Sequence, residues 1–192
     1  MEFQTERLIL RAWQDSDAES LFKYAKNPNI GPKAGWQPHT SVENSLEIIR
    51  TVLSADKTYA VMLKETGEAI GSVGIMTLRS EIRSAEMAEN ECEIGYWIGE
   101  PFWGQGLIPE AVQELLRYVF ENMRLSAVWC GYFDGNEKSR RVQEKCGFVY
   151  HHTEHNKPVP LLNDIRTEHF TRITFEDLEK RTASVQMEID RM

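Results

Sequence analysis

The first candidate for chemistry is a glycine-rich turn within Gly99–Ala111, between a strand pattern and a helix pattern. Free backbone amides of such a turn, aimed along the positive end of the following helix dipole, form an anion site. The spacing excludes two phosphate-binding motifs. Gln105 and Gly106 occupy the lysine and hydroxyl positions of a P-loop. A dinucleotide fingerprint starting at Gly104 would need a third glycine where Pro109 stands. A plain tight turn is the alternative interpretation.

A second candidate site lies in the segment Phe133–Phe148, which follows a later strand pattern. From Glu137 to Lys145 the segment carries four cationic side chains and two acidic ones. In a chain with a net charge of −8, this is a local basic site. Asn136, at the strand end, is placed to hydrogen-bond an amide-bearing ligand, and Ser139 lies about one helical turn further on.

A carboxylate and an indole share one face of the strand pattern 91–99. Strict alternation puts Glu93 and Trp97 on the same side, opposite Tyr96 and Ile98. That face either lines a cleft or faces water. A carboxylate in a cleft has a raised pKa and can accept a proton, which makes Glu93 a candidate base. An exposed glutamate, or one paired with an arginine, is the alternative.

Three histidines and one breaker-rich loop offer weaker signals. His151, His152 and His155 suggest a metal ion, yet no carboxylate or cysteine spacing completes a site, so we expect no metal. The glycines and prolines of 31–39 predict an irregular loop that carries an exposed Trp36 and His39. Packing of Trp36 on the surface of its own domain is the alternative to a role in binding.

The elements that must position these residues alternate between strand and helix periods. The predicted strands are 6–13, 58–63, 69–78, 91–99, 125–132, 148–153 and 166–174. Two helices are predicted to follow capping residues near 15–17 and 40–41. Two more are predicted to begin at 109 and 136, and a last helix is predicted over 175–191. The charged stretch 79–91 is predicted to be a solvated loop. This order is typical of one mixed α/β domain built on a central sheet.

The composition limits the class of protein. A chain of 192 residues with 41% hydrophobic residues suits a single domain. Net charge −8 argues against a protein that coats nucleic acid or an anionic membrane. An acidic start and the lack of a long apolar run predict a cytoplasmic protein. The three cysteines have no CxxC spacing, and we expect them to be buried.

Together the motifs resemble a GNAT-superfamily N-acetyltransferase. The resemblance is carried, in family order, by Ile94–Ile98, Trp103–Ala111, Asn136–Arg140 and Glu144–Phe148. The segment Thr5–Arg11 further resembles the RimJ/RimL branch of ribosomal-protein N-terminal acetyltransferases. The implied fold is a twisted, mostly antiparallel sheet flanked by helices, whose fourth and fifth strands are parallel and splay apart. The implied domain spans 1–192, with a core of about 5–174.

The resemblance implies that acetyl-CoA lies between the two splayed strands. Its pyrophosphate would take the amides of the glycine turn, and an amide near Ile98 would polarise the thioester carbonyl. The implied cofactor contacts are Trp97, Ile98, Gly104, Gln105, Gly106, Leu107, Ile108, Asn136, Lys138 and Arg141. The turn departs from the family pattern at Trp103 and Ile108, and a contact through the Ile108 amide tolerates the larger side chain.

The resemblance also assigns the chemistry. Glu93 would accept the proton of the ammonium group, directly or through water, and Ser139 would lie near the thiol as the proton donor. The tyrosine that many members use as the acid is replaced by Gln143. The loop with Trp36 and His39 would border the acceptor cleft.

The sequence therefore predicts direct transfer of an acetyl group from acetyl-CoA to a primary amine in a ternary complex. The amine is either a protein N-terminus or a small molecule, and an acidic surface favours a cationic acceptor. The alternative is a non-catalytic acyl-CoA-binding sensor or interaction module. We expect no nucleic acid or membrane partner, and a homodimer is compatible with the sequence.

Overall fold

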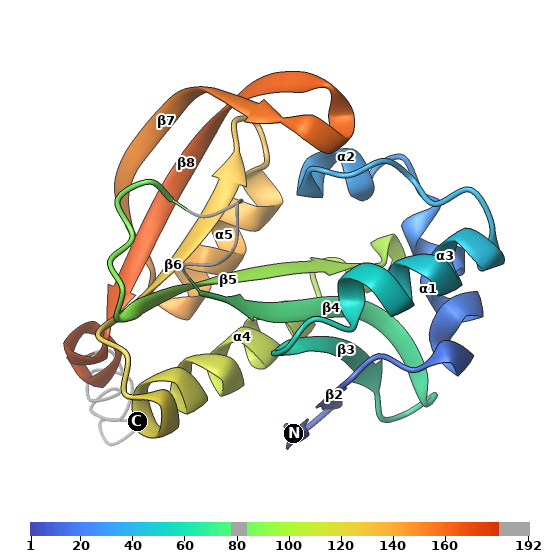
Figure 1. Cartoon of the computed structure of the whole chain (residues 1–192). Helices are drawn as coiled ribbons and strands as arrows, with labels where there is room; N and C mark the ends of the chain where they lie inside the picture. Colours follow the sequence, from blue (N-terminus) through green and yellow to red (C-terminus); the bar gives the residue numbers. More distant parts are fainter. Residues whose placement is uncertain (78–83, 181–192) are drawn as a thin grey trace.

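One eight-stranded sheet forms the centre of the protein (Figure 1). The computed structural model describes residues 1–77 and 84–180. The strands are β1 (Phe3–Gln4), β2 (Leu8–Arg11), β3 (Thr58–Leu63), β4 (Glu68–Met76), β5 (Glu91–Ile98), β6 (Ala127–Phe133), β7 (Val149–Val159) and β8 (Asp164–Thr174). Their spatial order is β1-β2-β3-β4-β5-β6-β8-β7. The β5–β6 pair is parallel and the other pairs are antiparallel, which confirms the predicted mixed sheet.

The helices begin and end where local chemistry favours it. They are α1 (Ala18–Ala25), α2 (Gly31–Ala34), α3 (Val42–Ile48), α4 (Leu107–Tyr118) and α5 (Glu137–Cys146). Ser41 caps α3 by accepting a hydrogen bond from the amide of Asn44 (3.1 Å). Asn136 caps α5 in the same way for Ser139 (3.3 Å). Gly147 ends α5 in the left-handed conformation (φ 94°), which glycine adopts without strain.

The two faces of the sheet carry separate cores. Leu8 and Leu10 of β2 pack in the core cluster that contains the buried face of α4. The intervening Ile9 packs in the cluster that contains the apolar residues of α1 and α3. Because side chains alternate across a strand, α1 and α3 cover one face of the sheet while α4 and α5 cover the other. All three cysteines are buried, as predicted.

Strands β5 and β6 separate after their first three residues. Their parallel pairing covers Glu91–Glu93 and Ala127–Trp129. Beyond that point β6 stays paired with β8 as far as Phe133, and β5 stays paired with β4 as far as Ile98. The splayed parallel pair implied by the family resemblance is therefore present, and a gap crosses the sheet between the carboxyl ends of β5 and β6.

Three local predictions need correction. The loop 31–39 contains the short helix α2, because one turn of helix fits between its breakers, and Trp36 is half-buried against the core instead of exposed. The described end of the charged stretch 79–91 is not simply solvated, since Ser84 and Met87 are buried. Residues 78–83 lie outside the described residues, and β1 is an edge strand that the pattern does not predict.

The predicted terminal helix is described in part. It begins at Phe175 and is helical as far as Lys180, and 181–192 lie outside the described residues. Figure 1 also shows the long β7–β8 hairpin reaching across to α2. In the described ranges, 1–77 and 84–180, no helix combines the length and apolar character needed to span a bilayer.

Candidate active site

The glycine turn has a backbone geometry that suits an anion. Gly104 and Gly106 have positive φ angles of 78° and 76°, and Gly106 immediately precedes α4. In the described residues, the amides of Gly104, Gln105 and Gly106 donate to no backbone carbonyl. The first amides of α4, at Leu107 and Ile108, have no partner within the helix. Five consecutive amides at the positive end of one helix can thus bind a phosphate group.

A clamp from the segment between β1 and β2 holds this turn in place. The guanidinium of Arg7 donates to the carbonyl of Gln105 (2.9 Å) and to the carboxylate of Glu110 in the first turn of α4 (2.7 Å). Glu110 also accepts from the hydroxyl of Thr5 (2.5 Å) and from the amide of Arg7 (2.8 Å). Sequence reasoning assigned Arg7 only to a family motif, and nothing in its spacing from Glu110 signals this contact.

The open edge of β5 presents backbone amides to the gap. The amide of Gly99 donates to Ile70 (2.8 Å), and the register places Ile98 opposite Gly71. Hydrogen-bonded and non-hydrogen-bonded pairs alternate in an antiparallel ladder, so the amides of Tyr96 and Ile98 point away from β4. The carbonyl of Ile94, two residues back, accordingly receives the Cys130 thiol of β6 (3.1 Å). These amides can donate to a ligand in the gap.

The basic segment of α5 is partly engaged. Lys138 holds its ammonium 3.3 Å from the centre of the Trp103 ring, which joins α5 to the glycine turn. Arg140 is ion-paired with Glu137 (2.7 Å) and Glu144 (2.8 Å), so much of its charge is compensated within the helix.

Both ends of the Asn136 amide have protein partners. Its oxygen caps α5, and its nitrogen donates to the carbonyl of Lys33 (3.4 Å). Arg141 is exposed on α5. The predicted ligand contacts of Asn136, Lys138 and Arg141 stay predictions.

Ser139 lies in a hydrogen-bonded group on the α4–α5 side of the gap. Its hydroxyl is 2.9 Å from the phenol of Tyr96 and receives the side-chain amide of Gln143 (3.2 Å). Gln143 in turn donates to the carbonyl of Gly131 (3.0 Å) and accepts from Thr171 (2.8 Å). Burial is the main cause that raises the pKa of Tyr96 well above its ordinary value, so the phenol stays protonated. Tyr96 thus brings a hydroxyl to the position where Gln143 cannot supply one.

Glu93 lies on the opposite face of the sheet and is 4% exposed. Its carboxylate accepts the amide of Ser84 (3.2 Å). Burial, followed by repulsion from the carboxylate of Glu168, raises the pKa of Glu93 to about 8. The ammonium of Lys157 opposes this rise, and it is ion-paired with Glu168 (2.7 Å). The raised pKa suits a base that works near neutral pH.

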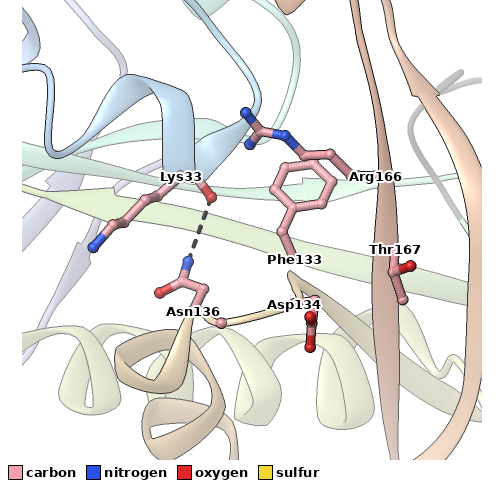
Figure 2. A pocket seen from close by; sticks show the side chains of 7 residues that line it. Lys33, Phe133, Asp134, Asn136, Arg166 and Thr167 are labelled. Carbon is pink, nitrogen blue, oxygen red and sulfur yellow. Dashed lines mark hydrogen bonds between the residues drawn. The ribbon is translucent and has the colours of Figure 1, made fainter.

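A cavity of about 340 Å³ opens beyond the carboxyl end of β6 (Figure 2). It is lined by Lys33, Phe133, Asp134, Gly135, Asn136, Arg166 and Thr167. The guanidinium of Arg166 lies over the Phe133 ring at 5.0 Å and donates to the carbonyl of Pro32. The cavity is therefore bordered by α2 on one side and by β8 on the other.

The two predicted acceptor-binding residues, Trp36 and His39, lie near this cavity but differ in their exposure and contacts. Trp36 packs edge-on against Trp97 of β5 (5.7 Å between ring centres). His39 is 7% exposed, and its Nδ1 is 2.8 Å from the hydroxyl of Ser45. Burial lowers the pKa of His39, so the ring is neutral at neutral pH. Trp36 thus stands beside the gap, whereas His39 faces the interior.

Comparison with known proteins decides the family. The acetyltransferase (GNAT) domain matches residues 7–149, well over half of the chain. The chain belongs to the GNAT acetyltransferase family. It is 31% identical over 150 residues to the uncharacterized N-acetyltransferase YoaA of Bacillus subtilis (strain 168). The aligned segment covers 76% of this chain and 81% of YoaA.

Two further relatives extend the GNAT comparison. The ribosomal protein uS5-alanine N-acetyltransferase of Escherichia coli (strain K12) is 24% identical over 157 residues, covering 75% of this chain and 76% of that enzyme. The solved structure of AAC(6')-Ib in complex with ribostamycin and coenzyme A has a TM-score of 0.71 at 19% identity, covering 91% of this chain and 97% of that one. The likeness to the RimJ/RimL branch is thereby confirmed.

The GNAT assignment establishes an acyltransferase of a family that uses acetyl-CoA. The structure brings the glycine turn, Lys138 and the open edge of β5 together around one gap. Ser139 lies on the α4–α5 face of the sheet, and Glu93 lies on the other face at the last paired residue of β5, where the gap begins. Sequence reasoning placed Tyr96 on the face opposite Glu93 and assigned it no role; the structure shows that this face meets α5.

Proposed function

We propose that this protein transfers the acetyl group of acetyl-CoA to a primary amine by direct attack in a ternary complex. The observation that carries the proposal is the gap between β5 and β6. It joins the two faces of the sheet, with the anion-binding turn and Ser139 on one side and Glu93 on the other. One substrate can thus enter from each face and meet in the plane of the sheet.

The cofactor is proposed to enter from the α4–α5 face. Its pyrophosphate would be bound by the amides from Gly104 to Ile108, with Lys138 and Arg141 near the remaining phosphate charge. The pantetheine chain would run along the open edge of β5 past Trp97 and Ile98. An amide of that edge, at Tyr96 or Ile98, would donate to the thioester oxygen and stabilise the negative charge that develops there.

The amine would enter from the α1–α3 face, past Trp36 and Trp97. The Tyr96 and Ile98 amides are three and five residues beyond Glu93, or about 10 and 16 Å along an extended strand. The ammonium proton would therefore reach Glu93 through bound water. The neutral nitrogen then attacks the thioester carbon. Glu93 would release the first proton to solvent through the same water and then accept the second proton of the nitrogen as the amide forms.

Collapse of the tetrahedral intermediate breaks the carbon–sulfur bond and leaves a thiolate. Ser139 is proposed to donate its hydroxyl proton to the sulfur and to regain one from the Tyr96 phenol at 2.9 Å. Tyr96 takes a proton from solvent in the same step, so that no free tyrosinate forms against its raised pKa. No metal ion takes part directly in these steps.

The acceptor is proposed to occupy the 340 Å³ cavity and the adjoining gap. A protein N-terminus is favoured by the likeness to the uS5-alanine enzyme, and a small-molecule amine is favoured by the likeness to the structure with ribostamycin. His39 would act indirectly, by holding the loop that carries Trp36.

Release of free thiol from acetyl-CoA tests the proposal. The protein would be mixed with alanine- and serine-starting peptides, polyamines and aminoglycosides, and we expect thiol release with at least one class. Isothermal titration with acetyl-CoA is the companion measurement. Binding without turnover for every acceptor would support the non-catalytic sensor instead, and absence of binding at millimolar acetyl-CoA would reject both.

Replacing Tyr96 with phenylalanine is expected to lower kcat roughly tenfold, because one hydrogen bond that serves the leaving thiolate is lost. In a Ser139→Ala background the same change should have little further effect, since the two hydroxyls act in series. Tyr150→Phe is the matched control, because its exposed phenol contacts Thr153 away from the gap. Equal effects of Tyr96→Phe in both backgrounds would contradict the proposed relay.

A further inference from the structure

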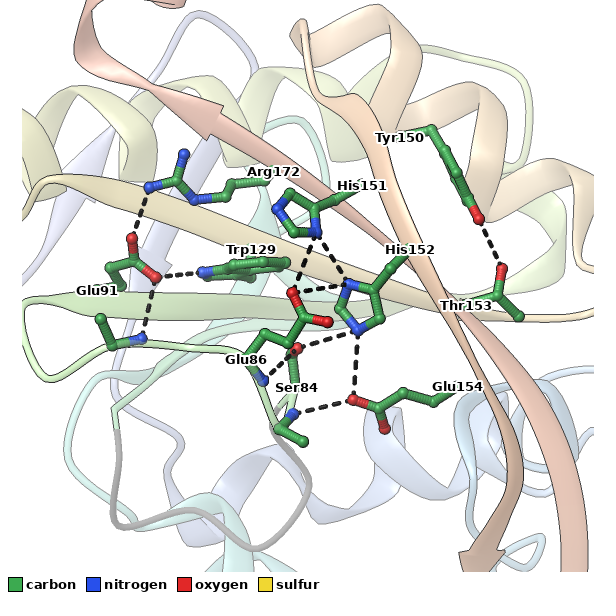
Figure 3. A network of polar contacts seen from close by, with 12 residues as sticks. Ser84, Glu86, Glu91, Trp129, Tyr150, His151, His152, Thr153, Glu154 and Arg172 are labelled. Carbon is green, nitrogen blue, oxygen red and sulfur yellow. Dashed lines mark hydrogen bonds and ion pairs between the residues drawn. The ribbon is translucent and has the colours of Figure 1, made fainter.

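Three metal-binding side chains from two distant segments meet at the edge of the sheet (Figure 3). Glu86 lies just before β5, whereas His151 and His152 are consecutive on β7. The two Nδ1 atoms are 3.0 Å apart, and the Glu86 Oε2 atom lies 3.6 Å from one and 4.0 Å from the other. Sequence spacing missed the carboxylate because it comes from 65 positions upstream of the first histidine.

A β-bulge turns the two histidines to the same side. In a regular strand, neighbouring side chains point to opposite faces. The β7–β8 register pairs Tyr150 with Thr171 and His152 with Phe170, so His151 is the extra residue of a bulge. A β-bulge changes the direction of nearby side chains. Here both imidazoles direct their Nδ1 atoms toward the same point.

The spacing of the three donor atoms matches a small transition-metal ion. The point equidistant from atoms separated by 3.0, 3.6 and 4.0 Å lies about 2.1 Å from each of them. That is the bond length that zinc forms with histidine nitrogen and carboxylate oxygen. Glu86 and His151 are exposed, so water can complete the coordination.

The surroundings hold the rings in a ligating orientation. When its Nδ1 binds a metal, His152 carries its proton on Nε2, which faces the Glu154 carboxylate at 3.4 Å and the Ser84 hydroxyl at 3.4 Å. Metal-bound histidines almost always donate their other ring N–H to a carboxylate, a backbone carbonyl or water. The His152 ring also stacks on Phe170 (5.1 Å, 15°), and Trp129 holds the His151 ring edge-on (4.7 Å).

We propose that Glu86, His151 and His152 bind one divalent transition-metal ion of the zinc class. Two imidazoles and one carboxylate with an open water position suit zinc better than magnesium or calcium, which prefer all-oxygen sites. The ion would fasten the segment before β5 to β7. Ser84 of that segment donates its amide to Glu93, so the bound ion would also fix the wall behind that carboxylate.

Isothermal titration of the tag-free, metal-stripped full chain with zinc chloride tests the site. We expect one ion per chain, with affinity at least tenfold weaker in His151→Ala and in Glu86→Gln. Both side chains are exposed. Glu86→Gln keeps the size of its side chain, and His151→Ala removes one ring contact with Trp129. The matched control is His155→Ala, an exposed histidine on the same strand that contacts Thr167 (3.3 Å) and should leave zinc affinity unchanged.

Cobalt gives a second readout. The visible spectrum of bound Co²⁺ should show four-coordinate nitrogen and oxygen ligation in the wild type and lose that signature in His151→Ala. Absence of zinc binding would overturn the proposal and leave the 3.0 Å contact as a hydrogen bond between the two rings. Zinc affinity equal in the wild type and in both ligand variants would overturn it as well.

Discussion

Glu93→Gln is expected to slow acetyl transfer at neutral pH by about 10²–10⁴-fold while leaving acetyl-CoA affinity unchanged. Glutamine keeps the size of the side chain and still accepts the Ser84 amide, but it cannot accept a proton. The carboxylate lies on the face opposite the anion-binding turn, so the change does not reach the proposed cofactor contacts. Steady-state kinetics and isothermal titration separate the two effects.

The pH dependence identifies the group responsible. Glu93 must be ionised to act, and its pKa is raised to about 8. The ratio of wild-type to variant kcat/KM should therefore increase with pH and level off above about 8. Ionisation of the acceptor amine is common to both proteins and cancels in the ratio. A ratio that does not change with pH would remove Glu93 from the proton route.

Thermal unfolding provides the control for folding. The pKa of Glu93 is higher in the folded protein than its ordinary value of 4.5, so the folded state binds more protons and stability falls as pH rises from about 4.5 to about 8. Glutamine resembles the protonated acid and avoids this loss. The variant should thus be less active than the wild type and yet more stable at pH 9. Loss of both activity and stability at pH 9 would instead indicate misfolding.

Gly106→Ala is expected to raise the Kd for acetyl-CoA roughly 10–100-fold. Gly106 has φ of 76°, a conformation that costs an L-residue about 1–2 kcal/mol. Relief of that strain would rotate the turn and withdraw amides that are proposed to bind phosphate, each worth about 1.5–3 kcal/mol in a charge-assisted bond. An added Cβ would be 3.6 Å from the Arg7 guanidinium, so a direct clash does not contribute.

Gly67→Ala is the matched control for this variant. Gly67 also has a positive φ, of 68°, with nothing within 4 Å of an added Cβ, and it lies in the β3–β4 turn. It should lose a similar amount of stability and bind acetyl-CoA normally. If both variants bind acetyl-CoA like the wild type, the turn is not the phosphate site.

Much of the fold could be predicted because local patterns and tertiary packing agree. The alternation in β5 and the start of α5 near Asn136 were each predicted from local pattern, and the structure confirms them. The helix α2 was missed because its four residues include a glycine and a proline, which have low helix propensity. Packing of Trp36 stabilises this helical turn. Met87 is buried against β6 and β8, and Ser84 contacts β5 and β7, which no local pattern in a charged stretch reveals.

The candidate site also has one part that the sequence predicts and another part that it does not. The glycine turn is contiguous in sequence, so its spacing alone predicts its geometry. The contacts of Tyr96 with Ser139, of Arg7 with Gln105 and of Glu86 with the histidines join residues 43, 98 and more than 60 positions apart. Predicting such contacts requires the strand order. For His151 it also requires a β-bulge, which no residue type in the sequence indicates.

The clamp between Arg7 and Glu110 links cofactor binding to the course of folding. Its two residues are 103 positions apart, so the loop that it closes is among the longest in the chain. During synthesis, residues 5–7 must wait until α4 has formed before the turn acquires its final shape. A partly folded chain would thus lack an ordered phosphate site, so acetyl-CoA would bind mainly to chains whose first and middle segments have already docked.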